Sequence, residues 1–164
     1  MALSIKNFKF KVVESLPVIL LFLISLNGIS IVDFNYFSIN LHYILVYYWV
    51  LKQPRVLGYG FIFLSGLISD VIFGFPLGVN ALTLLIIASV AAYVRLVTVN
   101  VNLLTDWISF IPAIFLANFV YFLSLYFSNY SIEYLYIFKN SISTLIFYPI
   151  LWGLFSILLR FMNS

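Results

Sequence analysis

Charged residues are too few in this sequence to cover the surface of a water-soluble protein. They make up 8% of the 164 residues, whereas hydrophobic residues make up 65%. A soluble domain usually has roughly 25% charged residues. The apolar excess must therefore face lipid, and we predict an integral membrane protein without a separate soluble domain.

The apolar residues are gathered in six runs, each close to the ~20 residues that a membrane-spanning helix needs. The runs are continuous, whereas the strands of a membrane barrel alternate polar and apolar residues. We therefore predict an all-α polytopic membrane protein, a six-helix transmembrane bundle that forms one domain over residues 1–164. The predicted helices cover roughly residues 15–32, 34–51, 56–75, 78–97, 106–127 and 141–160.

The basic residues fall almost entirely on one side of the predicted membrane. If the connection between the first two helices is outside, seven basic residues face inside and only Lys139 faces outside. Such an excess marks the cytoplasmic side, so we expect both termini in the cytoplasm. We also favour a retained first helix over a cleaved signal peptide. The seven residues are Lys6, Lys9, Lys11, Lys52, Arg55, Arg95 and Arg160.

Asp70 is the only carboxylate well inside a predicted helix. Such a charge is costly in the membrane, usually faces the bundle interior and often marks function. Gly66, Asp70 and Gly74 share one helix face, which allows another backbone to approach closely. The turn from Gly74 to Gly78 predicts a hairpin whose second helix offers its first amides and Asn80 to the carboxylate. We favour a structural staple over a transport or catalytic role.

His42 is the only histidine, and its predicted depth is similar to that of Asp70. A His42–Asp70 pair is therefore a possible proton relay. A lone histidine in a membrane helix is more often a hydrogen-bond partner of another helix, which is the interpretation we favour.

Three further groups of side chains suggest contacts. Tyr47-Tyr48-Trp49 lies beside Lys52 and Arg55, a composition typical of an anchor in the headgroup zone, and the short turn at Pro54 offers a contact for a partner. Asn118, near the middle of the fifth predicted helix, is a candidate for a bond between helices. The outer loop Asn129–Tyr136 is tyrosine-rich, which indicates an interfacial segment or a docking surface for a periplasmic partner.

Signatures of catalysis are missing from the sequence. It has no cysteine, one histidine, no Gly-x-Ser-x-Gly elbow and no His-Glu-x-x-His pair. We therefore predict no catalytic residue, no cofactor and no metal site. A net charge of +3 is too small to indicate nucleic acid.

The stretch Leu41–Tyr93 has, in order, a helix end with a tryptophan, a Pro/Arg turn, a G-x-x-x-D helix and a P-L-G-x-x-A-L hairpin. In this pattern it resembles the bacterial rod shape-determining protein MreD family. The family's frequent proline before the second helix is absent, because Phe37–Asn40 stands there. The residues of this pattern and its hairpin are Trp49, Pro54, Arg55, Gly66, Asp70, Gly74, Leu77, Gly78, Asn80 and Ala81.

The resemblance implies a non-catalytic scaffold of the inner membrane that helps to maintain rod shape during peptidoglycan synthesis. Its implied partners are a periplasmic MreC-like protein, an actin-like MreB, the cell-wall synthase and transpeptidase of the elongation complex, and membrane lipid. The family also resembles the substrate-binding subunits of energy-coupling-factor transporters. A small transporter or substrate-binding membrane subunit is therefore the alternative, which needs several convergent polar groups inside the membrane.

Overall fold

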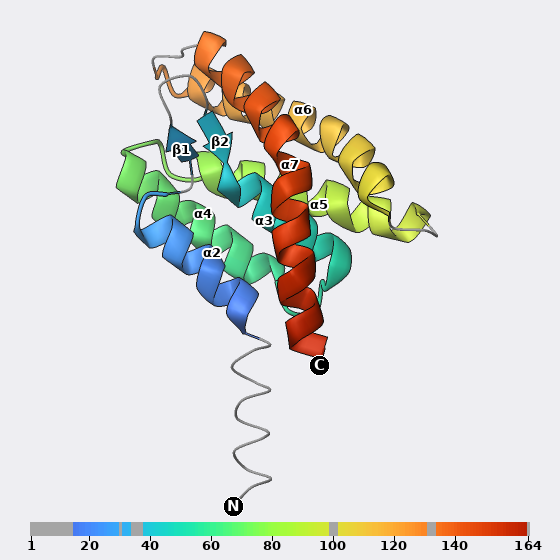
Figure 1. Ribbon diagram of the computed structural model, residues 1–164. Helices are drawn as coiled ribbons and strands as arrows, with labels where there is room; N and C mark the ends of the chain where they lie inside the picture. The colour runs from blue at the N-terminus through green and yellow to red at the C-terminus, as the bar shows by residue number, and fades with distance from the viewer. Residues whose placement is uncertain (1–14, 30, 34–37, 99–101, 131–133, 164) are drawn as a thin grey trace, which may run out of the picture.

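The computed structural model describes residues 15–29, 31–33, 38–98, 102–130 and 134–163. Apart from one short two-stranded hairpin, the regular structure of these residues is helical (Figure 1). The elements are α2 (Leu16–Leu26), β1 (Ile31–Asp33), β2 (Ser38–Asn40), α3 (Leu41–Lys52), α4 (Tyr59–Phe73), α5 (Val79–Val97), α6 (Leu103–Phe127) and α7 (Tyr134–Asn163).

Three of these helices are long and apolar enough to cross a membrane, namely α5, α6 and α7. The apolar helices α2 and α4 are shorter, with 11 and 15 residues. The start of α2 and the end of α7 lie at the lower end of the molecule in Figure 1, and the end of α6 lies beside the start of α7 at the opposite end. The described chain is therefore largely helical, with three helices that are long and apolar enough to cross a membrane.

The helix predicted over residues 34–51 was wrong at its start. It begins at Leu41, because Ser38–Asn40 pairs with Ile31–Asp33 in an antiparallel hairpin. The side chain of Asn40 accepts the N–H of Tyr43 at 3.1 Å and caps the helix. Residues 34–37 lie outside the described part of the chain.

The helices predicted over residues 15–32, 106–127 and 141–160 also have different ends. The first ends at Leu26, where Gly28 takes a left-handed conformation with φ of 65°, a common way for a helix to end. The last two begin earlier than predicted, at Leu103 and Tyr134. Hydropathy alone does not fix these ends, because apolar residues continue past them.

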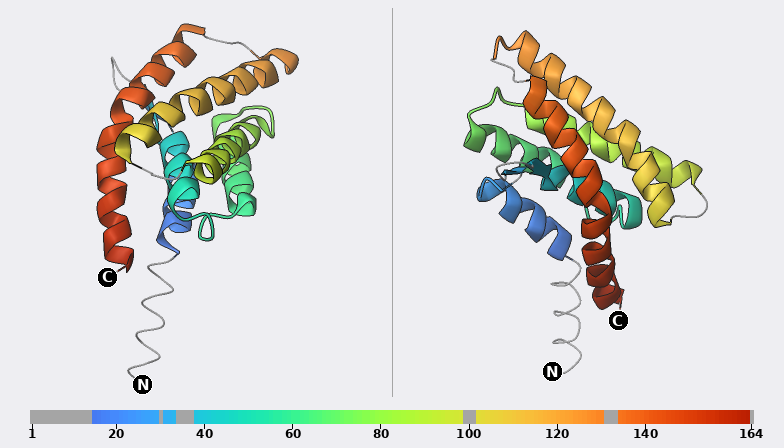
Figure 2. Two further views of the ribbon diagram at one scale, coloured as in Figure 1. Left: turned by 90° about the vertical axis from the view of Figure 1, so that its right-hand side faces the viewer. Right: turned by 45° about the horizontal axis from the view of Figure 1, so that its top comes forward.

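The helix α3 is the interior helix of the bundle, and every residue from His42 to Leu51 is buried. It packs against α2, α5 and α7, which come from both halves of the chain (Figure 2). These neighbouring helices surround α3 and form the core with it, so one of the shortest helices lies at the centre of the bundle.

The prediction that Tyr47-Tyr48-Trp49 anchors the protein in the headgroup zone was wrong. Each of these side chains is at most 1% exposed. The ring of Tyr47 packs on Phe110 of α6, and the rings of Tyr48 and Trp49 pack on Phe155 of α7. These aromatic residues therefore fill the core around the end of α3.

Candidate functional site

The hairpin of α4 and α5 is built around Asp70, as the sequence predicted. One carboxylate oxygen accepts the N–H of Gly78 and the other accepts the N–H of Asn80, both at 2.8 Å. Asp70 is fully buried. Gly74 and Gly78 both have positive φ, of 66° and 102°, so they supply the left-handed backbone that the turn requires.

The carboxylate thus caps the start of α5. The first amides of a helix have no partner within the helix, and its N-terminus attracts negative charge. Asp70 satisfies two of these amides and occupies the positive end of the α5 dipole. This contact offsets the cost of burying a carboxylate in the bundle.

The two helices of this hairpin touch through their backbones at Gly66. A β-carbon built on Gly66 would lie 2.3 Å from the Cα and 2.6 Å from the N of Ala81. No side chain fits between atoms this close. Gly66 therefore allows the close approach that the small-residue stripe predicted, with Ala81 as the other half of the contact.

Replacing Asp70 with asparagine is expected to destabilise the protein by about 1–3 kcal/mol. The amide oxygen can accept one of the two N–H groups, whereas the amide nitrogen would face the other donor. The loss is measured as the unfolding free energy in mixed micelles. Ser69→Ala is the matched control, because the buried Ser69 hydroxyl has no hydrogen-bond partner among the described residues and its removal should cost little. Equal stability of Asp70→Asn and wild type would refute the capping role.

The predicted pair of His42 and Asp70 does not form. Nε2 of His42 lies 3.0 Å from the hydroxyl oxygen of Ser25, which itself donates to the carbonyl of Leu21 at 2.9 Å. Within the described part of the chain, no hydrogen bond joins His42 to Asp70. His42 instead links α3 to α2, which agrees with the interpretation of a bond between helices. His42 and Asp70 were predicted at a similar depth in the membrane, but their side chains do not face each other.

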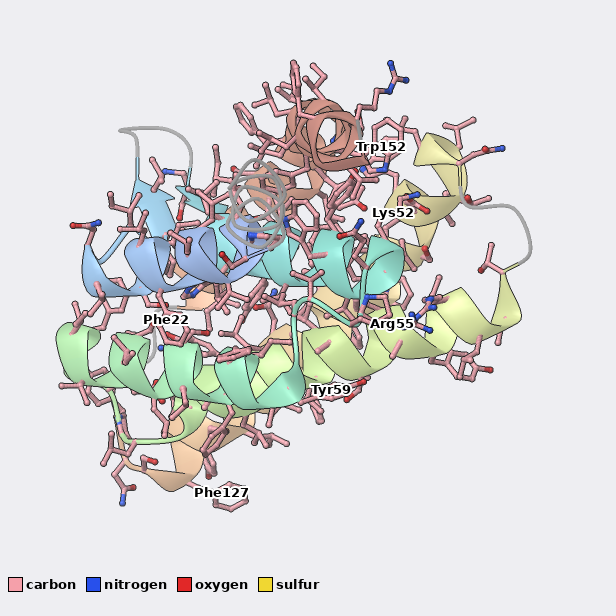
Figure 3. The ribbon with its side chains drawn as sticks, turned by 90° about the horizontal axis from the view of Figure 1, so that it is seen from below. Phe22, Lys52, Arg55, Tyr59, Phe127 and Trp152 are labelled. Carbon is pink, nitrogen blue, oxygen red and sulfur yellow. The ribbon has the colours of Figure 1, made fainter. Side chains whose placement is uncertain are left out.

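A buried ion pair that sequence reasoning missed lies at the other end of the bundle. Nζ of Lys52, at the end of α3, is 3.0 Å from Oδ2 of Asp106 in the first turn of α6. The indole N–H of Trp152 in α7 donates to the same oxygen at 2.8 Å. Nζ of Lys52 also lies 5.6 Å from the centre of the Trp152 ring, and the two residues are labelled in Figure 3. This cluster joins three helices.

The residues of the family pattern do not converge on one site. Trp49, Pro54 and Arg55 lie at the end of α3 and in the connection to α4, whereas the Gly74–Gly78 turn is at the far end of α4. Arg55 is exposed and lies near Tyr59 at the start of α4 (Figure 3). Trp49 is fully buried, and its indole N–H meets no acceptor in the described ranges. The pattern therefore specifies the two ends of the α3–α4–α5 unit.

A small polar cavity lies near the β-hairpin, where residues from both strands and from α3, α5, α6 and α7 meet. Its volume is about 20 Å³. A space of this size holds about one water molecule. Seven of its nine lining residues are asparagines or tyrosines, and these are Asn40, Tyr43, Asn80, Asn118, Tyr121, Tyr136 and Asn140. Neutral hydrogen-bonding groups thus converge here, at a place that the sequence did not indicate.

An apolar groove runs between α6 and α7 and has a volume of about 430 Å³. Asn118 and Ser141 are its polar lining residues, and the amide of Asn118 donates to the hydroxyl of Ser141 at 2.6 Å. The bond that we predicted for Asn118 between helices is therefore confirmed.

The predicted docking loop is described only in part, because residues 131–133 lie outside the described part of the chain. Tyr130 of this loop packs on Phe75 of the hairpin turn instead of standing free.

Comparison with known proteins gives no relative for this chain: no family model, no curated protein and no solved structure matches it. Among the described residues, no group of three histidine, cysteine, aspartate or glutamate side chains is placed to hold a metal ion. The candidate site is thus a closed hairpin whose buried carboxylate is bonded internally.

Proposed function

We propose that this chain is a non-catalytic membrane scaffold that maintains rod shape, as a member of the MreD family. In this role it holds an MreC-like partner within the cell-wall elongation complex of the bacterial inner membrane. The observation that carries the proposal is the closed α4–α5 hairpin. Its residues Gly66, Asp70 and Ala81 contact backbone, and none of them lines the cavity or the groove.

A scaffold needs a rigid shape rather than reactive side chains. The Asp70 carboxylate is fully buried with both oxygens bonded, so it cannot reach a substrate. The buried pair of Lys52 and Asp106 likewise serves to join α3, α6 and α7. These charged groups inside the bundle thus fix the arrangement of helices, as a protein acting through surface contacts requires.

The proposed topology has six crossings with both termini in the cytoplasm. The helices α5, α6 and α7 are long and apolar enough for three of these crossings. The shorter helices α2, α3 and α4 would complete the bundle, with α3 enclosed by the others. The distribution of basic residues supports this orientation, because Lys52, Arg55, Arg95 and Arg160 all fall near the ends that we assign to the cytoplasm.

A substrate-binding membrane subunit is the second candidate, and the polar cavity favours it. Four asparagines and three tyrosines converge there, which is what a solute site requires. However, a volume of about 20 Å³ is far below the several hundred Å³ of usual ligand sites. The small volume of the cavity therefore favours the scaffold function over the substrate-binding subunit.

The test is purification of the tagged full-length chain in mild detergent from its own bacterium. We expect an MreC-like membrane protein to be recovered with it. Recovery of a membrane-associated ATPase instead would favour the transporter subunit. Asp70→Asn is expected to reduce the amount of recovered MreC-like protein only in proportion to the loss of folded chain. The reason is that the hairpin supports the partner-binding surface and is not itself part of that surface.

A further inference from the structure

The turn between α4 and α5 is apolar and exposed. Leu77 is 72% exposed and Val71 is 68% exposed, and the nine residues from Val71 to Val79 include no side chain that can form a hydrogen bond. A turn that faces water usually consists of polar residues and glycine. The composition of this turn fits contact with hydrocarbon.

The length of the hairpin places its turn below the outer membrane surface. The 15 residues of α4, which follow Arg55, rise ~22 Å at 1.5 Å per residue. The stretch of α5 from Arg95 back to Gly78 rises ~26 Å by the same spacing. The hydrocarbon layer is ~30 Å thick. α4, which begins four residues after Arg55, and the stretch of α5 from Arg95 to Gly78 are therefore each shorter than this layer.

Most N–H groups of the turn have acceptors within the hairpin. The N–H of Phe75 donates to the carbonyl of Asp70 at 2.9 Å, and those of Gly78 and Asn80 donate to its carboxylate. Gly74 and Val79 donate to carbonyls at 3.4 and 3.3 Å, those of Val71 and Pro76. Pro76 has no N–H. The N–H of Leu77 has no acceptor in the part of the chain that the structure describes.

At membrane depth, irregular backbone is tolerated only where the protein itself covers it or satisfies its polar groups. Asp70 supplies both carboxylate oxygens and its carbonyl to this turn, and thus removes three N–H groups from contact with lipid. The tyrosine beside the turn marks the boundary. Tyr130 packs edge-on against Phe75 with ring centres 5.4 Å apart, and tyrosine is typical of the membrane–water interface.

We infer that the turn Gly74–Gly78 lies among the acyl chains of the outer leaflet, just beneath the headgroups, with Asp70 as its internal hydrogen-bond acceptor. The occupant of this apolar surface is lipid hydrocarbon. The inference rests on the membrane orientation proposed above. It does not depend on partner binding, so it can fail or stand separately from the scaffold function.

The chain has no cysteine, so single cysteine variants report single positions. The variants are Leu77→Cys at the apex, Phe115→Cys on the exposed face of α6, and Ser128→Cys directly after α6. Each full-length variant carries a nitroxide label in phospholipid vesicles without any partner. The measured quantity is the collision rate of the label with oxygen, which concentrates in lipid, and with a water-soluble nickel chelate.

The label at Leu77 is expected to collide often with oxygen and rarely with the chelate, as at Phe115 and unlike at Ser128. Chelate collision at Leu77 equal to that at Ser128 would overturn the inference. Chelate collision at Phe115 as well would overturn the proposed membrane insertion together with it. A chain that binds no MreC-like protein but keeps Leu77 in lipid would contradict the scaffold function alone.

Discussion

Replacing Lys52 with methionine is expected to destabilise the bundle by about 3–5 kcal/mol, because it leaves the buried Asp106 carboxylate without its cation. Asp106 is 1% exposed and Lys52 is 16% exposed. The Trp152 N–H remains as a hydrogen-bond donor, but it carries no charge to balance the carboxylate. The loss is measured as the unfolding free energy in mixed micelles of mild detergent and dodecyl sulfate.

The partner substitution Asp106→Asn is expected to cost less than Lys52→Met. The asparagine oxygen still accepts from Trp152, and the long side chain of Lys52 can turn its ammonium group toward the cytoplasmic surface. The double variant should regain part of the stability that Lys52→Met loses, since no buried charge is then left alone. If Lys52→Met and Asp106→Asn cost the same, the pair does not act through the buried carboxylate.

Replacing Gly66 with alanine is expected to separate α4 from α5 and to cost about 3 kcal/mol, the upper end of the usual range for overpacking. The new β-carbon would lie 2.3 Å from the Cα of Ala81. Carbon atoms in contact normally lie about 3.5–4.0 Å apart. Because the neighbour is backbone rather than a flexible side chain, the helices themselves must move, and the Asp70 bonds to Gly78 and Asn80 move with them.

Gly153→Ala is the matched control for this change. Gly153 also lies inside a helix, but among the described residues no atom of another element lies within 4 Å of the position that its β-carbon would take. Alanine there should stabilise α7 by about 0.5–1 kcal/mol, because glycine loses more backbone entropy in a helix. Thermal unfolding followed by size-exclusion chromatography separates the two outcomes. Equal effects of the two substitutions would refute the close contact at Gly66.

The hairpin could be predicted from the sequence because its contacts are local. The acceptor and the donors are eight and ten residues apart, at Asp70, Gly78 and Asn80. Two glycines and a proline fix the turn between them, and the spacing of Gly66 and Asp70 places both on one helix face. Short-range spacing therefore determines which atoms meet.

The core and the ion pair could not be predicted in this way. Lys52 and Asp106 are far apart in the sequence, and each stands next to a polar connection that resembles an ordinary membrane boundary. Hydropathy gives the depth of a residue but not the direction in which its side chain points. For this reason the sequence leaves a His42–Asp70 pair possible although His42 contacts Ser25, and it predicts an interfacial position for Trp49 although Trp49 is buried.

The β-hairpin was missed for a related reason. Ile31–Asp33 and Ser38–Asn40 are only three residues each and adjoin apolar helices, so an average over the length of a membrane span conceals them. A signal for the break was present in Asn27-Gly28, which ends α2, and in Asn40, which begins α3. Capping residues of this kind carry more information about helix ends than the apolar average does.

Quantitative recovery of the partner is the most direct test of whether this chain acts by holding another membrane protein. The tagged wild-type chain, purified from cells that produce both proteins, is expected to elute in one peak with an MreC-like protein at a constant ratio. The Gly153→Ala variant should recover the same amount, because the added methyl group meets no other element of the described chain. A folded wild-type chain that elutes without any MreC-like protein would contradict the scaffold function.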